Sequence, residues 1–181
     1  MEKMFDPQWY VVYTMPKSEK KVAESINGMG IESYLPMHKV IRQWSDRKKK
    51  LEVPLFPSYV FVKVNETKRV SLFSIKELIK FVSIEKKPVV VREKEIMNIK
   101  KVLSEDVQVA TEEYFQEGMR VRIGYGQFVG MEGVIVKKNN STRLVVKIDG
   151  LMKAFSFNIA SHVVEAVTSL QSSPEELEWK N

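Results

Sequence analysis

LFPSYVFVKV, residues Leu55–Val64, is the most informative stretch of the sequence for the fold. From Ser58 onward its residues alternate as in a β-strand. Two sets result, with Val60, Val62 and Val64 on one face and Tyr59, Phe61 and Lys63 on the other. Both faces begin apolar, whereas a strand in a small open sheet normally buries only one. Either helices cover both faces, or the face with Tyr59 and Phe61 is kept for a partner.

The elements predicted around this strand form an α+β domain over residues 1–103. In order they are a buried strand at Trp9–Thr14, a helix opened by Pro16, a long hairpin over 31–64 with a polar tip at 45–50, a helix from Thr67, a short strand at 80–84 and a helix at 93–103. The order β-α-β-β-α-β, followed by a helix, is typical of a ferredoxin-like α/β sandwich.

The second half of the sequence has a different pattern of apolar residues, in shorter runs. Residues 118–170 contain about five short alternating runs separated by turn signals, which predicts a small closed β-barrel. Residues 134–157 are rich in β-branched side chains, so we expect strands there and not a helical hairpin. Residues 104–117 carry five acidic and no basic side chains and lack a clear period, which favours a linker. The tail, residues 171–181, can form at most a frayed helix.

The composition favours some classes of function and argues against others. The net charge is +6, and the two basic halves are separated by the acidic linker, which favours a nucleic-acid partner over the alternative of a solvated lysine-rich surface. The chain has no cysteine and only two histidines, His38 and His162, far apart in sequence. No metal-ligand cluster or phosphate-binding glycine loop is present, so we expect no cofactor, no metal and no enzymatic activity. No apolar run could span a bilayer, and we expect a cytoplasmic protein that binds no membrane.

Taken together, the motifs resemble those of the NusG family of transcription elongation factors over nearly the whole chain. WYVVYT before a basic helix and PLFPSYVFV after a basic hairpin are similar to the family's N-terminal NGN domain. EGMRVRIGYGQFVGMEGVIV is similar to its KOW motif. The resemblance implies a ferredoxin-like NGN domain followed by an SH3-like, five-stranded KOW barrel.

The resemblance also implies a binding patch for RNA polymerase. In the family an apolar surface of the N-terminal domain receives the clamp helices of the largest polymerase subunit. The matching positions here are Tyr13, Phe56, Tyr59 and Phe61. Aromatic side chains suit such a contact because they bury a large area with few rotamers to freeze. The alternative is that Phe56 and Phe61 are ordinary core residues.

The predicted hairpin tip combines cations with an aromatic ring. That combination favours contact with an exposed nucleic-acid strand, and the family counterpart lies near the upstream DNA and the displaced non-template strand. The alternative is a solvated loop. The candidates are Arg42, Trp44, Arg47, Lys48, Lys49 and Lys50, with Lys17, Lys20 and Lys21 on the first helix extending the same track.

In the KOW segment, Gly126, Phe128, Gly130 and Gly133 are expected to build the loops of the barrel and not to contact a ligand. The family uses this barrel to dock other proteins, such as a ribosomal protein or Rho. Asp149 stands where the housekeeping factor typically has an apolar docking residue, which argues against that docking.

These patterns predict a monomeric transcription elongation or antitermination factor that binds the clamp helices and suppresses pausing or termination. The sequence is most similar to operon-specialised paralogues, such as those of capsular polysaccharide loci in Bacteroidetes. Two alternatives stay open: a housekeeping NusG that couples transcription to the ribosome or Rho, and a ribosome-associated RNA-binding protein with a KOW barrel. The sequence does not indicate whether the two domains pack together.

Overall fold

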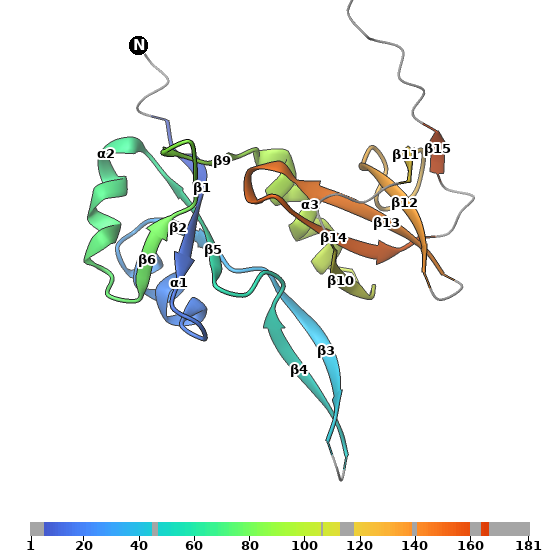
Figure 1. Cartoon of the computed structure of the whole chain (residues 1–181), viewed down its shortest axis with the longest axis horizontal. Helices are drawn as coiled ribbons and strands as arrows, with labels where there is room; N and C mark the ends of the chain where they lie inside the picture. Colours follow the sequence, from blue (N-terminus) through green and yellow to red (C-terminus); the bar gives the residue numbers. More distant parts are fainter. Residues whose placement is uncertain are drawn as a thin grey trace, which may run out of the picture.

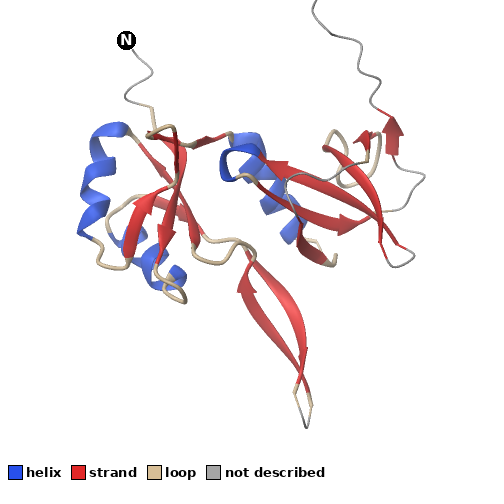
Figure 2. Cartoon of the chain, in the orientation of Figure 1, coloured by secondary structure: helices blue, strands red, loops and turns tan. Residues whose placement is uncertain are grey.

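The computed structural model describes residues 6–44, 47–105, 107–112, 118–138, 141–159 and 164–166. This part of the chain has a mixed α/β fold in which strands predominate, as predicted. Two sheets lie side by side, and a long hairpin projects from the first of them (Figures 1 and 2). The tail at 171–181 and His162 lie outside the described residues.

The first sheet, here the N-terminal sheet, is antiparallel and has the strand order β2-β5-β1-β6, with β9 also paired to β1. Its strands are β1 (Gln8–Thr14), β2 (Glu32–Tyr34), β5 (Tyr59–Val64), β6 (Leu78–Phe81) and β9 (Val90–Val91). The helices of this half are α1 (Glu19–Gly28), α2 (Glu66–Arg69), which continues as the 3₁₀ helix η2 (Val70–Ser74), and α3 (Glu93–Leu103). The elements follow one another along the chain in the predicted order.

Both faces of the N-terminal sheet are covered. On one face Val60 and Val62 of β5 pack with Val22 and Ile26 of α1. On the other face the buried cluster around Phe61 includes α3 residues. Fully burying such a side chain contributes about 1.5–3 kcal/mol each, so both faces contribute strongly to stability. Both faces of β5 are therefore apolar because both faces of the sheet are buried.

The hairpin consists of β3 (Met37–Gln43) and β4 (Lys48–Pro54), which pair in register from Met37–Pro54 to Gln43–Lys48. It extends away from both sheets (Figure 1). A second, shorter hairpin joins β7 (Ser83–Ile84) to β8 (Lys87–Pro88).

The second sheet, here the C-terminal sheet, contains the five strands expected of the barrel segment in the order β15-β11-β12-β13-β14. They are β11 (Met119–Ile123), β12 (Glu132–Lys138), β13 (Ser141–Ile148), β14 (Lys153–Asn158) and β15 (Val164–Ala166), with the 3₁₀ turn η3 (Asp149–Leu151) between β13 and β14. The prediction of strands across 134–157 is confirmed. A sixth strand, β10 (Val109–Glu112), pairs with β14 and comes from the segment interpreted as a linker.

Candidate functional site

The structure brings the four predicted polymerase-contact residues together on one side of the N-terminal sheet. Tyr13 and Tyr59 face each other across β1 and β5, and their rings meet edge to face with centroids 5.4 Å apart. Phe56, just before β5, meets Phe61 in the same way at 6.4 Å. We call these four residues the aromatic patch. Burial, followed by the nearby Tyr13, raises the pKa of Tyr59 above the ordinary tyrosine value, at which the hydroxyl is already protonated at neutral pH.

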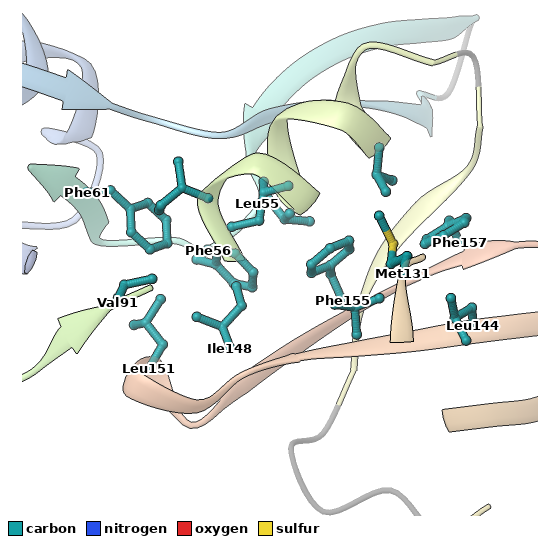
Figure 3. Packing of buried hydrophobic residues seen from close by; sticks show 14 of the residues in the cluster. Leu55, Phe56, Phe61, Val91, Met131, Leu144, Ile148, Leu151, Phe155 and Phe157 are labelled. Atoms are coloured by element: carbon teal, nitrogen blue, oxygen red, sulfur yellow. The ribbon is translucent and has the colours of Figure 1, made fainter. Parts of the chain in front are cut away.

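The aromatic patch is not open to solvent in this structure. Tyr13 and Tyr59 are half-buried, whereas Phe56 and Phe61 are 1% and 0% exposed. One continuous apolar cluster joins Phe56 and Phe61 to residues of the C-terminal sheet. Figure 3 shows this junction, in which side chains of both sheets share one cluster. The members contributed by the C-terminal half near the patch are Ile148, Leu151 and Phe155.

Polar contacts accompany the apolar junction. The Asp149 carboxylate pairs with the Arg92 guanidinium at 2.6 Å, and the backbone N–H of Asp149 donates to Glu95 Oε1 at 3.0 Å. Glu95 also caps α3, because its other oxygen accepts the backbone N–H of Arg92 at 2.9 Å. Lys153 places its ammonium 5.6 Å from the centre of the Tyr59 ring. Asp149, the predicted docking position, therefore faces α3.

The apolar part of the junction outweighs the ion pair. The Arg92 and Asp149 side chains are 67% and 53% exposed, and such pairs contribute about 0–1 kcal/mol. Glu95, through a hydrogen bond and its charge, raises the pKa of Arg92, with Asp149 adding less. The ion pair links η3 to the start of α3, while the buried side chains supply most of the stability of the contact. We call the packing of the C-terminal sheet over the aromatic patch the closed arrangement.

The hairpin tip carries the second candidate site. Trp44 is 49% exposed, and Lys49 holds its ammonium 5.5 Å from the centre of the indole ring. Arg42 lies opposite Lys49 in the ladder, and the backbone N–H of Trp44 donates to the backbone carbonyl of Arg47 at 2.8 Å, which closes the tip. Lys48 and Lys50 are exposed. The tip thus places the Lys49 ammonium over one accessible ring, with Lys48 and Lys50 exposed beside it, an arrangement suited to phosphates and a stacked base.

The lysines of the first helix lie apart from the tip. Lys17 precedes α1, and Lys20 and Lys21 lie in its first turns, whereas the tip is at the far end of the hairpin (Figure 1). Lys21 also pairs with Glu77 at 2.5 Å, and that hydrogen bond lowers the pKa of Glu77. The structure does not join these lysines to the tip in one cluster.

The four predicted KOW residues lie in turns of the C-terminal sheet or pack inside it. Gly126 and Gly130 have φ of +88° and +79°, values that other residues rarely adopt. A Cβ at Gly133 would lie 2.3 Å from the carbonyl oxygen of Val145 on the next strand. Phe128 is buried, with its ring centroid 4.7 Å from that of Phe157. These positions are consistent with a structural role.

Sequence reasoning missed the residues that cover the aromatic patch. No sequence pattern singled out Arg92, Glu95, Lys153 or Leu151. The signal available in the sequence was the run of apolar Ala154, Phe155 and Phe157, and in the structure Ala154–Phe157 of β14 are all buried instead of alternating. Consecutive burial of this kind indicates a strand covered on both faces.

The described residues contain no group of His, Cys, Asp and Glu side chains that could hold a metal ion. Among the same residues, no helix has the length and apolar character needed to cross a membrane.

Comparisons with known proteins agree with this architecture. Residues 7–100, more than half of the chain, match the sequence model of the family described as "Transcription termination factor nusG". The chain is 28% identical to the transcription termination/antitermination protein NusG of Lactococcus lactis over 179 residues, covering 90% of this chain and 95% of that protein. It is 24% identical to the protein of the same description from Borreliella burgdorferi over 148 residues, covering 70% and 80%. A solved structure described as "Domain interaction in Thermotoga maritima NusG" has a TM-score of 0.54 at 27% identity and covers 90% of this chain and 98% of its own.

Proposed function

Since this chain belongs to the NusG family of transcription termination and antitermination factors, we propose that its aromatic patch binds the clamp helices of the largest RNA polymerase subunit. The protein then acts without catalysis, by binding the elongating state of polymerase more tightly than the paused state. A ligand shifts such an equilibrium by its differential affinity alone.

The observation that carries this proposal is the geometry of the aromatic patch. Two tyrosines from β1 and β5 form one ring pair, and two phenylalanines from β5 and the turn before it form a second pair on the same side of the sheet. Clustered aromatic side chains of this kind supply much of the energy of protein interfaces. The tyrosine hydroxyls keep a polar group at the rim, where a helix pair can accept a hydrogen bond.

Binding at the aromatic patch requires that the closed arrangement opens. Phe56 and Phe61 are covered, so the clamp helices and the C-terminal sheet compete for the same surface. The apparent affinity for polymerase is then reduced by the fraction of molecules that are open. Any partner that binds the C-terminal sheet where it contacts α3 raises that fraction.

The hairpin tip is the proposed nucleic-acid contact. A projecting strand pair with exposed lysines and an accessible tryptophan can reach DNA next to the polymerase while the aromatic patch holds the clamp.

We also propose that the protein is a specialised antitermination factor and not the housekeeping member. The support is Asp149, which pairs with Arg92 and gives the C-terminal sheet a charged group in place of an apolar docking residue. Weak or absent binding to a ribosomal protein or Rho is the expected consequence.

The test of polymerase binding is a titration of the isolated clamp helices with the full chain and its Tyr59→Ala variant. Truncating a central aromatic anchor costs about 2 kcal/mol or more, so Tyr59→Ala is expected to weaken binding at least about tenfold. Losing the Lys153 contact to Tyr59 favours opening and acts in the opposite direction, which makes a net weakening a stringent result. The matched control is Tyr125→Ala, which removes a 53% exposed tyrosine from a loop of the C-terminal sheet and is expected to leave the affinity unchanged. Equal affinity of all three proteins would remove Tyr59 from the site.

A further inference from the structure

We propose that the edge of β14, together with Arg143, is a docking site for the acidic segment of this same chain, and that β10 bound there sets how tightly the C-terminal sheet covers the aromatic patch. The inference rests on the proposed polymerase site for its functional meaning. The structural part of the proposal can be tested on the free protein, without polymerase.

The first support is the strand pairing itself. β10 adds to β14 antiparallel, with Val109 opposite Phe157 and Glu112 opposite Ala154. The other edge of β14 is taken by β13, so β10 occupies the side that the five-stranded order leaves free. β10 has only four residues, and side-chain contacts add to its backbone pairing.

Arg143 supplies those contacts at both ends of β10. Its Nη2 donates to the carbonyl of Gln108, the residue before β10, at 3.2 Å. Its Nε donates to Ser156 Oγ at 2.8 Å, and that hydroxyl donates to Glu112 Oε1, also at 2.8 Å. The Arg143 Nε and the Glu112 carboxylate are 3.9 Å apart.

Burial makes these contacts specific. Arg143 is 9% exposed, Ser156 is 0% exposed, and the Glu112 side chain is 7% exposed. Two further bonds, to the Ser156 carbonyl at 3.0 Å and to Asn158 Oδ1 at 2.7 Å, fix the guanidinium on β14. A buried guanidinium needs a carboxylate partner, because an unpaired buried charge is costly. One acidic side chain of the linker, Glu112, therefore has a specific partner on the C-terminal sheet.

Docking of β10 shortens the tether between the two sheets. With β10 in place, only residues 104–108 connect the end of α3 to the C-terminal sheet. With β10 released, the connection runs over residues 104–118, three times that length. The effective concentration of a tethered partner falls roughly as the −3/2 power of tether length, which gives about a fivefold lower value. Release of β10 thus favours the open form that exposes the aromatic patch.

The test measures the free protein by electron spin resonance. The natural chain has no cysteine, so spin labels can be placed at Glu24→Cys on α1 and Met119→Cys on β11, both exposed positions. Glu112→Lys places a cation against Arg143 and is expected to raise the open-to-closed ratio about fivefold, as a larger share of long, broad distances. The matched control, Glu105→Lys, makes the same charge change in the same acidic segment outside β10 and is expected to leave the distances as in the unsubstituted protein.

Identical distance distributions for Glu112→Lys and Glu105→Lys would overturn the proposal. If Glu112→Lys unfolds the C-terminal sheet, the double variant Ala110→Pro/Thr111→Pro decides in its place, because it disrupts the β10 ladder and leaves Glu112, Ser156 and Arg143 unaltered. Broadening in that variant supports the proposal, and an unchanged distribution overturns it. The spin-label experiment contains no polymerase, so its result does not depend on clamp-helix binding. A failure of the proposed polymerase site would appear only in the clamp-helix titration.

Discussion

Replacing Leu151 with asparagine is the sharpest way to open the aromatic patch. Leu151 is 7% exposed and lies in η3, outside the strands of the C-terminal sheet. Figure 3 shows it near Val91 of the N-terminal half. Asparagine has nearly the same shape as leucine and adds no charge beside Arg92 and Asp149. The substitution therefore acts mainly on the closed arrangement.

The expected size of the effect comes from burial. Leaving a leucine side chain exposed instead of buried forfeits about 1.5–3 kcal/mol, and burying an amide without partners costs about 1–3 kcal/mol more. A loss near 3 kcal/mol changes the open-to-closed ratio by about a hundredfold. When the unsubstituted protein is less than about one-tenth open, the apparent affinity for the clamp helices rises by at least about tenfold.

Fluorescence anisotropy of labelled clamp helices measures this affinity. The matched control is Met152→Gln, a change of similar shape at the next residue, whose side chain is 49% exposed. We expect Leu151→Asn to bind the clamp helices at least about tenfold more tightly than Met152→Gln. The affinity of Met152→Gln is expected to equal that of the unsubstituted protein. Thermal unfolding verifies that both variants remain folded. Equal affinities for folded Leu151→Asn and Met152→Gln would show that the closed arrangement does not compete with the clamp helices.

Three further predictions concern the hairpin. Replacing Lys48, Lys49 and Lys50 with alanine is expected to flatten the salt dependence of binding to an elongation complex by roughly 0.7–0.9 in log–log slope per lost phosphate contact, and an unchanged slope would make the tip a solvated loop. Trp44→Ala is expected to weaken the same complex with little change in slope, because stacking releases no counterions; a slope change as large as that of the lysine variant would contradict stacking. Burial lowers the pKa of His38, against a smaller opposing effect of the Val109 backbone, so the folded protein favours the neutral ring. The free energy of unfolding should therefore fall as the pH drops through the ordinary histidine value near 6.5 towards the lowered pKa, and His38→Gln should reduce this fall in pH-dependent denaturant titrations.

Local patterns in the sequence predicted much of the fold because their causes are local. The helix at 93–103 follows from apolar residues at helical spacing, and the structure gives it the same bounds. The two faces of Tyr59–Val64 follow from strand alternation, and each face belongs to a separate buried cluster. Two extended runs around a polar tip predicted a hairpin over 31–64, but the structure separates its base, where β2 pairs with β5 in the N-terminal sheet, from the projecting β3–β4 pair. The tip is also shorter than the predicted 45–50, because β4 begins at Lys48.

Contacts between distant residues could not be predicted in the same way. β10 was missed because Glu112 lies in an acidic segment, and the strands that carry its partners Ser156 and Arg143 come much later in the sequence. The cover over Phe56 was missed because Leu151 and Phe155 are equally well explained as core of their own sheet. In the structure Phe56 and Phe61 lie in a buried cluster shared by the two sheets, as the core alternative expects, and their role as a partner surface stays a proposal.

The most direct test of the proposed function is transcription by purified RNA polymerase through an intrinsic terminator, with and without the protein. The account predicts more full-length transcript in its presence, a further increase with Leu151→Asn at the same subsaturating concentration, and a loss of the effect with Tyr59→Ala. Termination that is unchanged by the unsubstituted protein and by Leu151→Asn, with both shown to be folded, would contradict it.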